Sequence, residues 1–335
     1  MTFEDRVRAV ADFGFTARQA RFLVTVMLHA GVCLPRQYAA FAGIVHGQKT
    51  RLFFAKLVHR RYAAAYRCRH HRGRIYQVHH KALYRAIGQT DSRHRRPLSP
   101  ARVVRGLMLM DAVLADPTVI WLTDQDAAAG LTERPPIDLN RRSHLGIGAP
   151  SDARRRVAEQ LPVGLDATGR VILLYLATDS EVGPCHAFVD RYLERLRDLP
   201  AWTLRIVVPP WPSGLGEFYA KAVTEEFTAT LRPAWLSDLR RHFAERRQVD
   251  AGAGTPPDPE HFDQAEQAFR APRYQRLYRR WLIDGDRVFD LAAEGLKPAI
   301  ESGAGRIETV ILPHRYGHLE PLVNATTRKT QGPRP

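Results

Sequence analysis

Apolar residues recur at helical spacing in three segments near the start of the chain. The first segment, 17–30, follows Thr16, a residue type that caps helix N-termini, and it stops before Gly31. A second short helix is predicted over 36–42 and a third from about 48–60, because apolar positions lie three and four residues apart in each. The positions of the first segment expected to face a core are Phe22, Leu23, Val26, Met27 and Ala30.

A β-hairpin is predicted directly after the three helices. Two β-prone runs, 62–68 and 74–79, flank a basic connection that ends at Gly73, and a short helix near 81–87 follows. Three helices followed by a hairpin is the order of a winged helix-turn-helix domain. In such a domain the third helix enters the major groove of DNA, and the hairpin tip contacts the backbone or the minor groove.

The distribution of charge turns this fold prediction into a binding prediction. Residues 1–100 contain 19 Lys and Arg but only 4 Asp and Glu, whereas residues 101–335 contain 31 of each kind. The whole net charge of +15 therefore lies in the segment with the predicted helices and hairpin. A fold needs no such asymmetry, but a polyanionic partner does, and contacts of Lys and Arg with phosphates supply most non-specific nucleic-acid binding. Double-stranded DNA is the partner that we expect.

Candidate DNA contacts lie at the start of the third helix, further along it, and at the hairpin tip. Glutamine can pair with adenine, and Arg or Lys with guanine, while the other cations hold phosphates. The alternative is that these are solvated charges on an ordinary surface helix. The predicted contact residues are Gln48, Lys49, Thr50, Arg51, Lys56, Arg60, Arg69, His71, Arg72 and Arg74.

Histidine and cysteine residues gather around the hairpin and raise the alternative of a metal site. They are Cys68, His70, His71, His79 and His80. Strand alternation sends His79 and His80 to opposite faces, and no spacing in the cluster matches a closed metal site. No phosphate-binding glycine loop is found either. We therefore predict no metal and no cofactor.

The sequence carries no apolar run near the ~20 residues that span a bilayer, and no signal peptide is visible. The three cysteines are far apart and form no Cys-x-x-Cys pair. These features predict a cytoplasmic, nucleoid-associated protein without membrane contact.

The neutral remainder of the chain predicts a mixed α/β domain with helical C-terminal additions. A helix at 100–114 has apolar positions that suit either a dimer contact or burial against its own domain. The strand 170–177 is apolar on both faces and is expected at the centre of a covered sheet. The other predicted strands are 118–122, 161–165, 202–208 and 307–312, and the predicted helices are 186–197, one or two in 216–246, 260–269, 273–282 and 286–296.

Together these elements predict the α+β class and five regions. The predicted regions are 1–90 (winged-helix domain), 91–116 (linker and connecting helix), 117–249 (α/β domain), 250–325 (helical region with a final strand) and 326–335 (disordered tail).

The pattern over 13–209 resembles the bacterial replication-relaxation family of plasmid and mobile-element regulators. The segments that carry this resemblance are 15–22, 53–58 and 161–165. The resemblance implies a DNA-binding winged helix followed by a compact α/β domain, in a regulator that acts on transcription or replication.

The α/β region also resembles the core of restriction-endonuclease-like folds. That resemblance implies an Asp on one strand and an acidic-x-Lys triplet on the next, which hold Mg²⁺ and position water. Here Val163 stands where such enzymes have Asp, and the triplet region 175–177 has neither acid nor base. Asp166 lies in the turn, and Asp179 lies beyond the strand without a Lys. The predicted core is therefore an inactive one.

Three functions follow from these observations. The first is a sequence-specific, dimeric DNA-binding regulator of a mobile element, whose α/β domain dimerises, senses an effector or binds a protein partner. The second is a nuclease with an atypical metal site, and the missing triplet argues against it. The third is a non-catalytic adaptor that recruits a larger complex to DNA.

Overall fold

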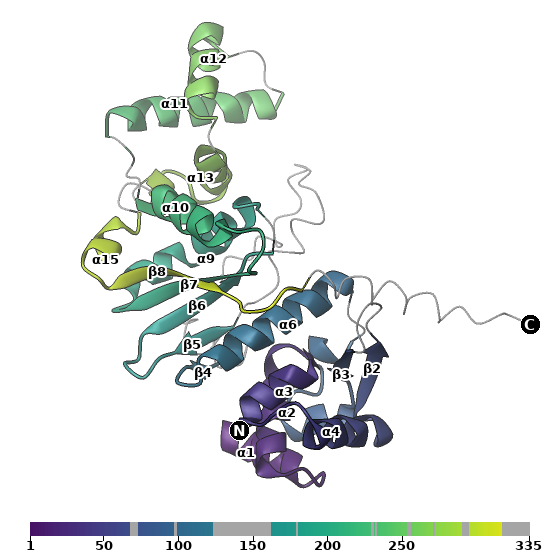
Figure 1. Ribbon diagram of the computed structural model, residues 1–335. Helices are drawn as coiled ribbons and strands as arrows, with labels where there is room; N and C mark the ends of the chain where they lie inside the picture. The colour runs from purple at the N-terminus through teal and green to yellow at the C-terminus, as the bar shows by residue number, and fades with distance from the viewer. Residues whose placement is uncertain are drawn as a thin grey trace, which may run out of the picture. The chain divides into compact units, whose positions relative to one another are not determined.

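The computed structural model describes residues 1–67, 73–96, 99–122, 162–178, 180–228, 231, 233–252, 256–270, 272–289 and 295–316. Within these ranges the chain forms helices and two sheets, which confirms the α+β class (Figure 1). No helix in the described ranges is both long and apolar enough to cross a membrane. The chain divides into two compact units, one of Met1–Thr123, Val207–Ser213 and Val310–Pro335, the other of Asp124–Ile206 and Gly214–Thr309.

The first unit begins with a helix that the apolar pattern did not indicate. Helix α1 (Phe3–Ala11) starts at a capping box, in which the Thr2 side chain and the Asp5 side chain accept each other's backbone N–H. Its buried residues include Val7 and Val10. Helix α2 (Ala17–His29) also starts at a capping box, and the five apolar positions predicted to face a core are all buried.

A small antiparallel sheet completes the first unit. Helices α3 (Pro35–Ala42) and α4 (Gln48–His59) follow a two-residue strand, β1 (Val32–Cys33), that was not predicted. Strands β2 (Ala63–Arg67) and β3 (Arg74–Val78) pair antiparallel and confirm the hairpin. The sheet order is β1-β3-β2, so the second hairpin strand lies in the middle.

Aromatic side chains hold α4 against the other helices. Phe53 lies 4.3 Å from Tyr38 of α3 and 6.3 Å from Phe22 of α2, measured between ring centroids. Phe54 lies 4.2 Å from Tyr76 of β3. Such ring contacts add stabilisation beyond the area they bury, so they fix how far α4 is rotated about its axis.

The segment after the hairpin is packed rather than loose. Helix α5 (Lys81–Ala86) is followed by a turn of 3₁₀ helix, η1 (Arg93–Arg95). His94 lies so close to Gly31 that a Cβ added there would sit 2.7 Å from the His94 carbonyl oxygen. Gly31 has φ +71°, so this position suits glycine both in backbone conformation and in space.

Helix α6 (Pro100–Ala115), predicted to connect two domains, is an integral part of the first unit. Gly106 lets it approach β1, because a Cβ there would lie 2.8 Å from a methyl of Val32. Leu107 and Met110 are fully buried within this single chain. Of the two alternatives for this helix, burial within its own chain is therefore the observed one.

Asp111 of the first unit pairs with Arg36 and also holds Tyr316, which comes from late in the chain. Arg36 of α3 donates two hydrogen bonds to Asp111 of α6, at 2.8 and 2.6 Å. Gln37 donates to Asp111 at 3.0 Å, and the hydroxyl of Tyr316 donates to it as well. Burial and the Asp111 carboxylate raise the pKa of Tyr316, so the hydroxyl keeps the proton that it donates.

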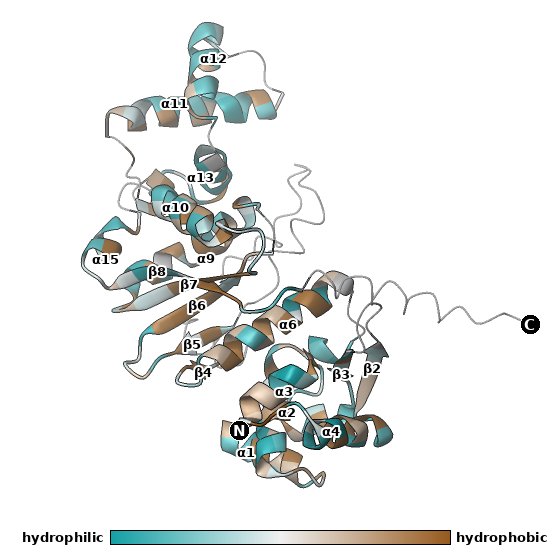
Figure 2. Cartoon of the chain, in the orientation of Figure 1, coloured by the Kyte–Doolittle hydropathy of each residue, from teal (hydrophilic) through white to brown (hydrophobic). Residues whose placement is uncertain are grey.

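The second sheet has the order β4-β5-β6-β7-β8. Strand β4 spans Ile120–Trp121, β5 Val163–Leu165, β6 Val171–Leu176, β7 Trp202–Val208 and β8 Gly305–Ile311. All but the first residue of β6 are buried, as predicted for a central strand, and Figure 2 shows the apolar colour concentrated in β6 and β7. The backbone N–H of Trp202 donates to the carbonyl oxygen of Ala304, and that of Leu312 donates to the carbonyl oxygen of Val208. The residue numbers of the partners rise together along both strands, so β7 and β8 are parallel.

Most helices of the second unit lie where the sequence predicts them. They are α9 (Gly183–Asp198), α10 (Leu215–Thr228), α11 (Pro233–Asp250), α12 (Pro259–Ala268), α13 (Pro272–Asp284) and the short α15 (Lys297–Glu301). The predicted helix 286–296 falls partly outside the described residues. The predicted boundary at 250 does not separate two units, because these helices cluster with the α/β residues.

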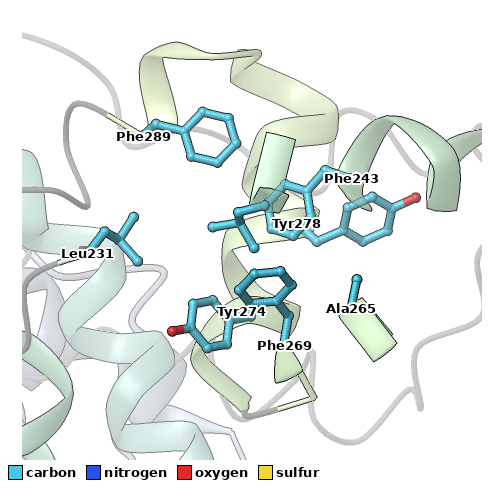
Figure 3. Close-up of a cluster of buried hydrophobic side chains, with 8 residues drawn as sticks. Leu231, Phe243, Ala265, Phe269, Tyr274, Tyr278 and Phe289 are labelled. Carbon is cyan, nitrogen blue, oxygen red and sulfur yellow. The ribbon is translucent and has the colours of Figure 1, made fainter. Parts of the chain in front are cut away.

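Two interactions fasten the C-terminal helices to one another and to the α/β part. Arg276 of α13 forms ion pairs with Asp190 of α9 and Glu226 of α10. An aromatic cluster shared by α11, α12 and α13 includes Phe243, Phe269 and Tyr278 (Figure 3). These contacts make the C-terminal helices an extension of the α/β unit.

Replacing Gly106 with Ala is expected to destabilise the protein. Alanine favours a helix by roughly 1 kcal/mol over glycine, but forcing a methyl into a filled core costs roughly 1–3 kcal/mol. The second effect dominates because Val32 is buried and stiff. We expect a net loss of about 1 kcal/mol in the free energy of unfolding, measured by urea titration. The control is Gly183→Ala, a helical glycine with open space around it; equal stability of both variants would contradict the close approach of α6.

The stability of the first unit is expected to fall as the pH decreases from 7 to 5. Burial, with a contribution from nearby Arg6, lowers the pKa of His29 from 6.5 to about 4. Below pH 6.5 the unfolded chain therefore binds a proton that the folded chain refuses, and folding loses roughly 2 kcal/mol by pH 5. Urea titrations at the two pH values should show a smaller change in His29→Gln than in the unaltered protein. The exposed His46→Gln serves as control, and identical pH dependence in all three would refute the buried neutral histidine.

Candidate nucleic-acid interface

Helix α4 presents one face to the core and the opposite face to solvent. Thr50, Phe53, Phe54 and Leu57 are buried. The exposed residues of α4 are Gln48, Lys49, Arg51, Leu52, Ala55, Val58 and His59. The sequence therefore supplies a helix that is anchored by aromatic packing and free to contact a ligand along its length.

The first turn of α4 breaks a general rule of helix composition. Helix N-termini carry partial positive charge and favour acidic residues, as in the first turn of α1, which holds Glu4 and Asp5. The first turn of α4 has no acidic residue and carries Lys49 and Arg51 nearby. Neither of these cations has a carboxylate partner among the described residues. Helices α2, α5 and α13 also lack an acidic residue in the first turn, so this composition alone does not distinguish α4, but both of its cations are exposed.

Two of the predicted contact residues serve the fold as well. Lys56 donates to the carbonyl oxygen of Gly14 and lies 4.9 Å from the ring centroid of Phe15. Arg60 donates to the carbonyl oxygen of Phe13 at 2.7 Å. These bonds tie the second half of α4 to the loop between α1 and α2. They hold the helix in place, a role that the sequence pattern did not reveal.

Thr50 does not fit the predicted contact set. Its side chain is fully buried, and its hydroxyl has no hydrogen-bond partner among the described residues. A residue on the core side of α4 cannot reach DNA that approaches the outer side. We therefore correct the prediction for Thr50. It lies half a turn around the helix from the exposed residues Gln48 and Leu52.

The hairpin supplies cations beside α4. In the register of β2 and β3 the backbone of Arg67 is paired with that of Arg74, and the Arg74 side chain is exposed. The predicted contacts Arg69, His71 and Arg72 lie at 68–72, outside the described residues.

The chemical background of this surface is uniformly basic. The sequence has no acidic residue from Phe13 to Thr90, while the same stretch holds 14 Lys and Arg. Glu4, Asp5 and Asp111 of the same unit are paired with Arg21, Arg8 and Arg36. These three acids are thus engaged with arginines outside α4.

A metal site near the hairpin finds no support among the described residues. No group of three or more His, Cys, Asp or Glu residues in those ranges is arranged to hold a metal ion. Burial, and then the neighbouring His80 and Arg95, lower the pKa of His79, so this side chain stays neutral and adds no charge. Cys68, His70 and His71 lie outside the described ranges.

The described strands of the nuclease-like region contain no carboxylate in a catalytic position. Val163 of β5 and residues 175–177, at the end of β6 and just after it, are buried and include neither an acid nor a base. Asp166 closes the β5–β6 turn: its side chain accepts from the N–H groups of Thr168 and Arg170 and from the Thr168 hydroxyl. Asp179 lies outside the described residues.

No protein-family model matches this chain, and neither a curated protein nor a solved structure matches it. The resemblance to the replication-relaxation family therefore stays a prediction from the sequence.

Plasmid DNA is expected to stay uncut when the protein is incubated with Mg²⁺ or Mn²⁺. The strands β5 and β6 lack the carboxylates that would hold the ion, and Asp166 is committed to a turn. Conversion of supercoiled DNA to nicked or linear forms is the measurement, made on an agarose gel with EDTA as the control. Metal-dependent cutting lost in Asp179→Ala would contradict the inactive core and point to a different ligand set.

Proposed function

We propose that this chain is a double-stranded DNA-binding regulator whose first unit is a winged helix. Helix α4 is the major-groove helix and the β2–β3 hairpin is the wing. The order α2, β1, α3, α4, β2, β3 and the sheet order β1-β3-β2 support this assignment. The observation that carries the proposal is the pair Lys49 and Arg51, two exposed cations at the start of a helix that no carboxylate among the described residues neutralises.

The anchoring of α4 suits this role. A helix that reads DNA must hold its position so that a few side chains meet base edges in register. Lys56 and Arg60 bind backbone carbonyls of the α1–α2 loop, and Phe53 and Phe54 fill the core behind the helix. The outward side chains are therefore presented on a rigid element.

The α/β unit supplies the regulatory part of the proposal. Most of its residues belong to the second compact unit, and the resemblance to mobile-element regulators favours control of transcription or replication. Selection of bound sequences from random duplexes distinguishes the oligomeric forms, because a palindromic motif requires a two-fold dimer. A single asymmetric half-site would indicate a monomer on DNA.

The double variant Lys49→Ala/Arg51→Ala is expected to weaken duplex binding at least tenfold. It should also flatten the dependence of log K on log salt by roughly 1–2, since about 0.9 is lost with each phosphate contact. Fluorescence anisotropy with a labelled duplex at several salt concentrations measures both quantities.

The matched control removes two exposed cations from the second unit, in Lys221→Ala/Arg306→Ala. This control should bind as the unaltered protein does. Equal loss in both double variants would show that only net charge matters, and equal binding in all three proteins would refute the assignment of α4.

Point variants are a sharper test than deletion of the first domain. Removing residues 1–99 would expose Leu107 and Met110, which are fully buried in the intact chain. Loss of binding in such a truncated protein would then report misfolding as readily as a missing interface.

A further inference from the structure

Helix geometry identifies the residues of α4 that point farthest from the core. Each residue turns roughly 100° about the helix axis, so Gln48, Leu52 and His59 lie within about 40° of one line. The buried Thr50, Phe54 and Leu57 lie on the opposite side. Leu52 occupies the middle of the outward line, and its exposed fraction is 61%.

Single exposed leucines are common on protein surfaces, but Leu52 lies among cations on the outward side of α4. Cationic Lys49 and Arg51 flank it, and the adjacent outward residue Ala55 is also apolar and exposed. The exposed Val58 of the same helix lies roughly 120° away from Leu52 around the axis, beside the line of Arg51 and off the line of Gln48, Leu52 and His59. Apolar surface is thus centred where a helix in a groove would come closest to the bases.

The charges around Leu52 select one kind of partner. An apolar centre with a cationic rim suits a ligand that has an apolar group surrounded by anions. The major groove offers such a group: the C5 methyl of thymine, which projects between two phosphate backbones. A protein partner would have to bring acidic side chains to the same rim.

We infer that Leu52 contacts the C5 methyl of a thymine in the major groove. The inference rests on the proposed function and adds to it the base that the centre of the helix reads. Gln48 lies one turn earlier on the same line, and its amide can pair with the N6 and N7 edge of adenine. On this assignment the half-site contains a thymine opposite Leu52, at the middle of α4.

Uracil in place of thymine tests this contact, because deoxyuridine removes the methyl and keeps every hydrogen-bonding group. The duplex is the one recovered by selection from random sequences, with dU placed at one thymine at a time. We expect one position at which binding of the unaltered protein weakens about fourfold, the value for one methyl-sized group removed from a buried contact. Leu52→Ala should bind the dT and dU duplexes equally.

The matched control is Val58→Ala, which removes exposed apolar atoms from the same helix away from the outward line. It should discriminate between dT and dU as the unaltered protein does. Leu52→Met keeps an apolar side chain and should retain part of the discrimination, and circular dichroism checks that each variant is folded.

Several outcomes would overturn the inference while leaving the proposed function intact. Specific binding that ignores every dT-to-dU change would show that no methyl is read, and unchanged discrimination in Leu52→Ala would assign the methyl to another residue. A selected half-site without thymine would have the same meaning, and it would favour a protein partner for Leu52. Failure of the protein to bind any duplex would overturn the proposed function and the inference together.

Discussion

The packing of Phe53 and Phe54 beneath α4 is the constraint on which the first unit depends. Their rings contact aromatic residues of α2, α3 and β3 at centroid distances between 4.2 and 6.3 Å. Because a helix has only one rotation that buries both rings, the same packing decides which residues face outward. The polar and basic character of the outer side follows from the core, and no separate interaction is needed to orient it.

The parts of this fold that could be predicted have strong local signals. The helix 17–30 has a cap, a stop and regular apolar spacing, and the hairpin has two β-prone runs closed by a glycine. Helix α1 was missed although Thr2 and Asp5 form a capping-box pattern, because its apolar positions are few. Strand β1 has two residues and depends on pairing with β3 for its existence, so no periodicity marks it.

The candidate site divides in the same way. Lys49 and Arg51, predicted as DNA contacts, are exposed, and their contact with DNA stays a prediction. The burial of Thr50 depends on the rotation of α4, which charge composition cannot reveal. The anchoring roles of Lys56 and Arg60 involve carbonyls 42 and 47 residues away. Such contacts arise from tertiary packing, and sequence spacing contains no record of them. The position of Asp166 in the turn is local, and the Asp-x-Thr-Gly pattern predicted it correctly.

The hydrogen bond from Tyr316 to Asp111 joins residues 205 positions apart. On a ribosome the helices of the first unit emerge long before this tyrosine does. Arg36 and Asp111 can pair as soon as α6 has left the exit tunnel, but the third member arrives only after most of the remaining chain has been made. The first unit therefore gains this contact only after the intervening residues of the second unit have been synthesised.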